Sequence, residues 1–136
     1  MNKNEIDKQK IVRKLRYFLL KEKNILFAYL HGSFVDGNQF NDIDISIYLD
    51  ERGSKKINHA DFEISFSLSL EKAINIPVDV KILNNSPLSF RYHATKGHLL
   101  LSRDDSTRAE FLRRTWNEYL DFLPVSKIYL EEIGRA

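Results

Sequence analysis

Hydrophobic and polar residues recur along this chain with two different periods, which predicts a mixture of helices and strands. Near both ends the apolar residues recur at helical spacing, whereas between them they alternate or form short runs. The pattern predicts helices over Glu5–Lys23 and Thr107–Leu123 and strands over Ile25–Leu30, Asp42–Leu49, Pro77–Leu83 and His98–Leu101. Residues 87 to 96 fit neither period clearly. The order of elements predicts an α/β (α+β) fold, a small mixed sheet flanked by helices.

The predicted helix Thr107–Leu123 has residues typical of a helix start and of a helix end. Thr107 with Glu110 fits a capping box at its start. Pro124 follows its last apolar residue, and we expect the helix to stop there.

The segment Phe62–Leu70 fits both periods. Its apolar and polar residues alternate strictly, as in a strand, but Phe62, Phe66 and Leu70 also share a helical stripe that continues into Ala73. We expect a helix, because the segment lies between two strands whose acidic residues must come together. A crossover helix is the usual connection between neighbouring parallel strands.

Length and composition narrow the class of protein. A chain of 136 residues has the size of one domain, so we expect a single domain over residues 1–136. No apolar run approaches the roughly 20 residues of a membrane span, and the polar start Met1–Lys10 lacks the apolar core of a secretory signal, so we expect no membrane association and a cytoplasmic location. A net charge of +2 gives no reason to expect direct nucleic-acid binding.

Two aspartates lie at the start of a predicted strand. Asp42 and Asp44 project from the same face, while Ile43 and Ile45 point into the core. Carboxylates so close repel each other and favour a cation. Because the chain has no cysteine, a metal would be held by carboxylates and imidazoles, and Mg²⁺ is the hard ion to expect. A pair of metal ions bridged by carboxylates suits phosphoryl or nucleotidyl transfer.

A glycine–serine turn precedes these aspartates. Gly32 follows a predicted buried strand and lets the backbone approach a phosphate, to which the Ser33 hydroxyl and the following N–H groups can donate. Gly37 would let that turn end. A third carboxylate, Asp79, lies on the polar face of another predicted strand, where Lys81 shares its side. Two interpretations fit these features: an ordinary turn and strand whose aspartates are solvated at the surface, or a phosphate cradle that faces metal ligands.

These motifs carry a resemblance. A strand, "GS", a glycine four residues after the serine and then "DID" resemble the nucleotidyltransferase superfamily that includes DNA polymerase β. The segments "PVDVKILNNSPL", "KGHLLLSRD" and "EYLDFLP" resemble its small stand-alone members, the minimal nucleotidyltransferases (MNT), which are antitoxins beside HEPN-type ribonuclease toxins. The resemblance runs from Ile25 to the C-terminus. It implies the nucleotidyltransferase fold, with Asp42, Asp44 and Asp79 as catalytic metal ligands and Gly32 and Ser33 on the nucleotide.

The resemblance also implies an activity and a partner. It implies Mg²⁺-dependent transfer of AMP from ATP to a tyrosine of a cognate HEPN toxin, which would silence the toxin. Two alternatives share these motifs. In one, a weak or inert enzyme neutralises its partner by binding, with the segment Trp116–Ile133 as a candidate interface. In the other, the chain adenylylates a small molecule.

The chain departs from the family pattern in one loop. Only residues 34 to 41 separate Ser33 from Asp42, a shorter loop than is typical, and Asn41 stands where serine is usual. Such a loop can shrink the nucleotide pocket. Gly53–Ser54, which is followed by Asp61, imitates the motif without a preceding buried strand, and we interpret it as a loop without function. Two other polar residues have two possible roles each. His31 can flank the nucleotide or pack against its neighbours, and Lys81 can steady a phosphate or be solvated. We interpret the remaining histidines, His59, His93 and His98, as structural or surface residues.

Overall fold

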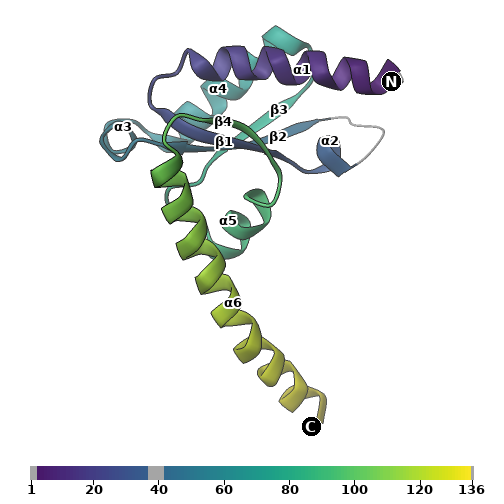
Figure 1. The fold of residues 1–136 in the computed structure, drawn as a ribbon, viewed down its shortest axis with the longest axis vertical. Coiled ribbons are helices and arrows are strands. Elements are labelled where there is room, and N and C mark those ends of the chain that lie inside the picture. The colour runs from purple at the N-terminus through teal and green to yellow at the C-terminus, as the bar shows by residue number, and fades with distance from the viewer. Residues whose placement is uncertain (1–2, 37–41, 136) are drawn as a thin grey trace.

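The structure, a computed structural model, describes residues 3–36 and 42–135 and has a mixed β-sheet at its centre (Figure 1). In these residues the sheet has four strands, β1 (Ile25–His31), β2 (Ile43–Leu49), β3 (Val78–Ile82) and β4 (His98–Ser102), in the order β3-β2-β1-β4. β1 is antiparallel to both β2 and β4, and β2 is parallel to β3. The expected α/β class and all of the expected strands are confirmed, although β2 begins at Ile43.

Helices cover both faces of the sheet. They are α1 (Lys3–Leu20), α2 (Ser33–Asp36), α3 (Glu51–Lys55), α4 (His59–Ile74), α5 (Leu88–Ala94) and α6 (Asp105–Arg135). Figure 1 shows α1 and α4 on one side of the sheet and α5 and α6 on the other. The ambiguous residues 87 to 96 therefore contain α5. Gly53–Ser54, interpreted above as part of a loop, lies in α3, because the Asp50 side chain accepts a hydrogen bond from the Arg52 N–H and caps this short helix.

Strand alternation divides the buried side chains between the two faces. On one face, alternate residues of the strands, including Ile43, Ile45 and Val80, pack against Leu15 of α1 and Leu70 of α4. The opposite face is aromatic, and the residues that form its core are Phe27, Tyr29, Tyr48, Leu83, Ala94 and Phe111. Since successive strand residues point to opposite faces, the polar residues of β2 lie on the aromatic side.

The segment Phe62–Leu70 lies within α4, as expected, and α4 connects the parallel strands β2 and β3. β3 lies at an edge of the sheet, and three of its backbone N–H groups donate to side chains of α4. Val78 donates to Glu71 (3.0 Å), Val80 to Ser67 (3.0 Å) and Ile82 to Glu63 (2.8 Å). The acceptors are four residues apart on α4, an advance of about 6 Å, and the donors are two residues apart on β3, an advance of about 6.6 Å. The two spacings therefore match. We call Glu63, Ser67 and Glu71 the α4 ladder.

The α4 ladder explains why this segment also resembles a strand. Its alternating polar residues form two helical stripes. Glu63, Ser67 and Glu71 face the edge of β3 and occupy donors that would otherwise be open to another chain. Ser69 belongs to the other stripe, and its hydroxyl donates within the helix to the Ser65 carbonyl.

The α4 ladder predicts that Ser67→Ala lowers the free energy of unfolding by about 1–3 kcal/mol, because the half-buried Val80 N–H loses its acceptor. Urea unfolding followed by circular dichroism measures the change. Ser69→Ala is the matched control on the same helix and should have little effect. Equal losses in the two variants would contradict the role of the Ser67 hydroxyl as acceptor of the Val80 N–H.

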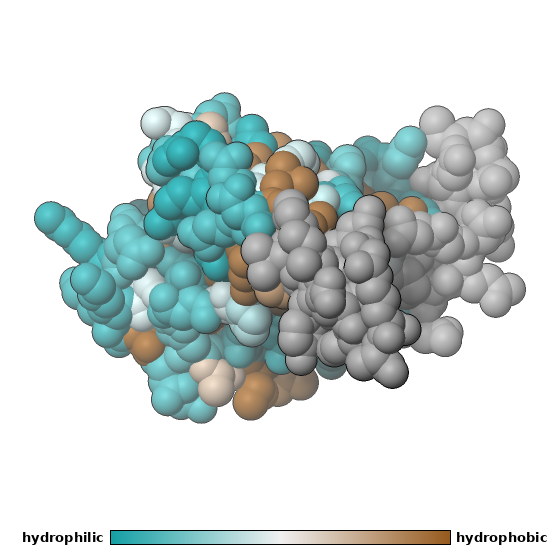
Figure 2. All heavy atoms as spheres, turned by 90° about the horizontal axis from the view of Figure 1, so that it is seen from below, coloured by the Kyte–Doolittle hydropathy of each residue, from teal (hydrophilic) through white to brown (hydrophobic). Residues whose placement is uncertain are grey.

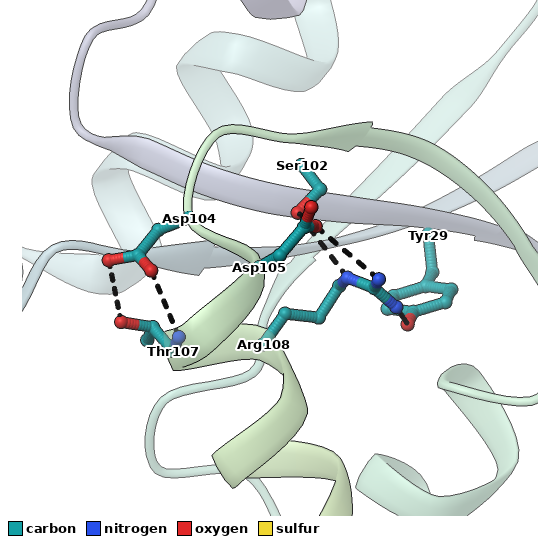
Figure 3. A network of polar contacts seen from close by, with 6 residues as sticks. All are labelled: Tyr29, Ser102, Asp104, Asp105, Thr107 and Arg108. Carbon is teal, nitrogen blue, oxygen red and sulfur yellow. Dashed lines mark hydrogen bonds and ion pairs between the residues drawn. The ribbon is translucent and has the colours of Figure 1, made fainter.

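The start of α6 differs from the expectation. The helix begins at Asp105, and the preceding Asp104 carboxylate accepts hydrogen bonds from the Thr107 N–H (3.0 Å) and hydroxyl (2.7 Å), as Figure 3 shows. The predicted capping box is therefore wrong, because Thr107 already lies inside the helix and donates to Asp104. Glu110 accepts instead from Arg113, at 2.6 Å.

A second set of contacts in Figure 3 joins the start of α6 to the sheet. Asp105 accepts from the Ser102 hydroxyl at the end of β4, and Arg108 donates to the Tyr29 hydroxyl of β1 (3.2 Å). The direction of α6 is therefore fixed against two strands.

The end of α6 also differs from the expectation, because the helix continues through Pro124 to Arg135. Proline removes one backbone donor and crowds the preceding turn, but the hydrogen bonds of neighbouring residues remain. The residues that follow, "VSKIYLEEI", are compatible with a helix. Figure 1 shows the second half of α6 projecting away from the sheet. Within the described residues, no helix combines the length and the apolar character that a membrane span requires.

The Asp104 cap predicts a pH-dependent contribution to stability. The Thr107 N–H and then the Thr107 hydroxyl hold the pKa of Asp104 below its ordinary value. A lowered carboxyl pKa contributes stability above the pKa of the unfolded state and loses it as the pH falls through the folded value. Asp104→Ala should therefore lower the Tm at pH 7 by a few degrees, and much less at about pH 2.

Thermal unfolding followed by circular dichroism at the two pH values measures this difference. Asp104→Asn, which keeps an acceptor for the cap, should retain more of the Tm than Asp104→Ala at pH 7. A decrease of the same size at both pH values would contradict the role of the ionised carboxylate.

Candidate functional site

The register of β2 and β3 brings two of the predicted carboxylates together. Asp44 pairs with Asp79 across the parallel strands, and the next polar pair is Ser46 with Lys81. Paired residues of adjacent strands project from the same face. Asp44 is half-buried, whereas Asp79 is exposed and lies with its Oδ1 3.8 Å from the Lys81 Nζ. The side chains of Asp44 and Asp79 therefore form an acidic pair at one end of the sheet.

The third predicted carboxylate belongs to Asp42, an exposed residue just before β2. Burial raises the pKa of Asp44 above its usual value, and the negative charges of Asp42 and Asp79 raise that pKa further, while His31 opposes them. Asp44 thus interacts electrostatically with both of the other carboxylates. Their mutual repulsion creates a local demand for positive charge.

The glycine–serine turn lies directly against this acidic cluster. Gly32 has a φ of 82°, and its carbonyl accepts a hydrogen bond from the Val35 N–H (3.1 Å) as α2 begins at Ser33. A Cβ at Gly32 would collide with the Asp44 Oδ2. The left-handed backbone therefore favours glycine here, and an added Cβ would also push the Asp44 carboxylate aside.

His31 packs beside the same carboxylate. It ends β1 opposite Asp44, shares a 2.7 Å hydrogen bond with the Ser46 hydroxyl, and sets its ring edge-on to Phe90 at 5.8 Å. Burial lowers the pKa of His31, although the charges of Asp44 and Asp79 act in the opposite direction. These contacts favour the packing role over a charged contact with the nucleotide.

Ser46 was not among the candidates that the sequence suggested. Its side chain is completely buried and holds His31 beside Asp44. The signal was present in the sequence, because Asp42, Asp44 and Ser46 alternate with isoleucines and so share one face. Gly37 and Asn41, with the rest of residues 37–41 of the shortened loop, lie outside the described residues.

The donor set suits a hard divalent cation. Within the part of the chain that the structure describes, no three histidine, aspartate or glutamate side chains form a ready-made metal-binding group. Asp42, Asp44 and Asp79 nevertheless offer carboxylate oxygens, and the negative charge of Asp44 is destabilised by burial and by the charges of the other two. Carboxylate oxygen is the ligand that Mg²⁺ prefers, so these residues fit that ion chemically.

The contact between Gly32 and Asp44 predicts that Gly32→Ala lowers the free energy of unfolding by about 1–2 kcal/mol or more. Chemical unfolding curves measure the loss. Gly53→Ala in α3 is the control, since Gly53 has a helical backbone and the added Cβ there also needs a side chain, that of Asn24, to shift. If Gly32→Ala were as stable as Gly53→Ala, the left-handed turn against Asp44 would be contradicted.

The sequence of the chain also matches a model of a known protein family. The family model described as "Polymerase beta, Nucleotidyltransferase" matches residues 13–106. The chain belongs to this nucleotidyltransferase family, as its motifs suggested. No curated protein sequence matches the chain significantly.

Solved structures show the same fold. One is a complex of a tri-AMPylated Shewanella oneidensis HEPN toxin with an MNT antitoxin, in which the matched chain is 16% identical, with a TM-score of 0.65 and coverage of 96% of this chain and 98% of that chain. Another is a toxin–antitoxin with AMP-PNP, at 17% identity, a TM-score of 0.72 and coverage of 90% and 97%. A third is the toxin–antitoxin MntA–HepT, at 15% identity, a TM-score of 0.64 and coverage of 95% and 97%. These likenesses establish the nucleotidyltransferase fold for this chain.

Proposed function

We propose that this protein is a Mg²⁺-dependent nucleotidyltransferase that acts as an antitoxin, transferring AMP from ATP to a tyrosine of a cognate HEPN toxin. The observation that carries the proposal is the half-buried Asp44, which is influenced by the charges of Asp42 and Asp79 and lies against the Gly32 turn. Membership of the nucleotidyltransferase family supports the reaction class. The reaction would take place in the cytoplasm, where ATP is available.

Each residue would have a distinct task. Asp42, Asp44 and Asp79 would hold two Mg²⁺ ions, by analogy with two-metal transferases, and the metal would offset the negative charge of the phosphates. Gly32 would let the backbone approach the nucleotide, and Ser33 would donate to a phosphate oxygen. The acceptor hydroxyl forms a bond to the α-phosphorus, the bond from that phosphorus to the bridging oxygen breaks, and pyrophosphate leaves.

The proton of the acceptor hydroxyl also needs a destination. Asp79 is the candidate base, because its carboxylate is exposed at the end of the sheet, where an incoming side chain can reach it. The half-buried Asp44 is less accessible. The acceptor itself would come on a partner protein. Among proteins of similar fold, one complex contains a tri-AMPylated HEPN toxin and another contains AMP-PNP, which supports ATP and such a toxin as the reactants.

A second candidate function is neutralisation of the partner by binding alone. The specific observation that favours it is that α6 leaves large apolar side chains exposed, namely Trp116, Leu120 and Leu123 on one stripe and Phe122 on another side of the helix. Figure 2, which views the molecule from below, shows hydrophobic side chains in several patches on an otherwise hydrophilic face. Such a surface could hold a partner without chemistry.

The enzymatic proposal predicts that ATP, Mg²⁺ and the partner together increase the mass of the partner by one or more AMP groups. Asp42→Asn or Asp44→Asn should reduce the rate by roughly 100-fold or more, because each loses a charged metal ligand. Intact-protein mass spectrometry over a time course measures the transfer. Asp61→Asn, on the exposed side of α4, is a control that should keep the activity.

Two outcomes would count against this function. Undiminished transfer by the Asp42→Asn and Asp44→Asn variants would exclude the proposed site. If a variant with Asp42, Asp44 and Asp79 all replaced by asparagine still suppressed the toxicity of the partner in cells, neutralisation by binding would be the function instead.

A further inference from the structure

A hollow of about 480 Å³ adjoins the candidate site on the side away from Asp79. The residues that line it are His31, Gly32, Val35, His93, Lys96 and Gly97. Gly32 belongs to both places, since it lies against Asp44 and also lines the hollow. In the sheet order β3-β2-β1-β4, the carboxylates are on β2 and β3, whereas the hollow lies between the end of β1 and the start of β4. The candidate site therefore extends across the end of the sheet.

The two halves of this extended site differ in charge. Asp42, Asp44 and Asp79 make one half acidic, and Lys96 with its ammonium group makes the other half basic. The turn that begins with Gly32 and continues into α2 (Ser33–Asp36) brings no positive charge, because it contains no lysine, arginine or histidine and one aspartate, Asp36. A polyphosphate bound over Gly32 would therefore need a cation from outside this turn.

Two other cations near α2, Lys8 and Arg16, belong to α1. The Arg16 Nε donates to the Leu100 carbonyl at 2.8 Å, which secures a bulge of β4. The Lys8 Nζ lies 5.3 Å from the centre of the Phe34 ring. Both residues line a different hollow, between α1 and α2. Lys96 is the lysine that lines the hollow beside Gly32.

The chain between α5 and β4 is packed closely onto the end of β1. A Cβ at Gly97 would overlap the Leu30 carbonyl oxygen and crowd the His31 Cβ, so only glycine permits this approach. Lys96 is carried to the hollow by the same contact. Its Nζ lies 5.1 Å from the centre of the Tyr92 ring, which stacks on Tyr119 at 3.8 Å. The lysine therefore has a defined aromatic support while it remains exposed.

We propose that Lys96 binds the β- and γ-phosphates of the nucleoside triphosphate in this hollow. The inference rests on the proposed nucleotidyl transfer and assigns the side chain that receives its leaving group. When the acceptor oxygen bonds to the α-phosphorus, the bond to the bridging oxygen breaks and that electron pair stays on pyrophosphate. An ammonium group at this place stabilises the charge that develops there.

The test separates the phosphate tail from the rest of the nucleotide. Isothermal titration calorimetry in the presence of Mg²⁺ measures binding of tripolyphosphate, AMP-PNP and AMP to the full chain. Lys96→Met should weaken tripolyphosphate and AMP-PNP by roughly tenfold or more and leave AMP unchanged, because AMP has no β- or γ-phosphate. Lys96→Arg should restore most of the affinity, since it keeps the charge.

Lys72→Met is the matched control, a lysine replaced on α4, remote from the hollow. It should bind all three compounds as the unsubstituted protein does. The proposal would be overturned if Lys96→Met bound tripolyphosphate as well as Lys72→Met does, or if it weakened AMP and AMP-PNP equally. These titrations need no acceptor and no turnover, so their failure is distinguishable from failure of the proposed transfer reaction, which the aspartate variants test.

Discussion

The parallel pairing of β2 with β3 is the constraint on which the candidate site depends. This register sets Asp44 beside Asp79, although like charges on adjacent strands disfavour the sheet by up to about 1 kcal/mol. The opposite faces of the same strands compensate, because Ile43, Ile45 and Val80 are buried in the core. A slip of one residue would expose these apolar side chains and separate the carboxylates, so core packing and site geometry are fixed by the same register.

The α4 ladder couples the helix to this arrangement. Glu63, Ser67 and Glu71 bind successive alternate N–H groups of β3, so they fix the strand along its length as a neighbouring strand would. Asp79 lies between two of these bonded residues, Val78 and Val80. The ladder thereby positions a strand that carries a candidate catalytic residue, and it leaves the exposed face of that strand open to an acceptor.

The sequence predicted the parts of the fold that depend on local periodicity and on the logic of connections. The strands followed from alternating side chains or from short apolar runs. α4 followed from the need to connect parallel strands, although its own residues also alternate like a strand. The α4 ladder could not be foreseen, because it depends on the three-dimensional match of two repeats. The ends of α6 were also missed, since Asp104 and Thr107 compete for the same capping role and since a proline does not stop a helix whose neighbouring bonds survive.

The candidate site was predictable to a similar extent. Asp42 and Asp44 came from residue type and alternation, Gly32 came from the turn, and the family resemblance added Asp79, so the residues of the acidic half were already named. The hydrogen bond between Ser46 and His31, which supports this acidic half, was not predicted, because it requires β1 and β2 to be in register. The basic half was missed for the same reason: Lys96 and Gly97 are far from the motif in sequence and reach it only because β4 pairs with β1.

The central claim is that these carboxylates bind a nucleoside triphosphate through Mg²⁺. The most direct measurement is calorimetric titration of the unsubstituted protein with AMP-PNP, first with Mg²⁺ and then with the metal removed by a chelator. The account predicts that removal of Mg²⁺ weakens binding by at least about tenfold, because the acidic cluster would then repel the phosphates. Equal affinity with and without Mg²⁺ would contradict it.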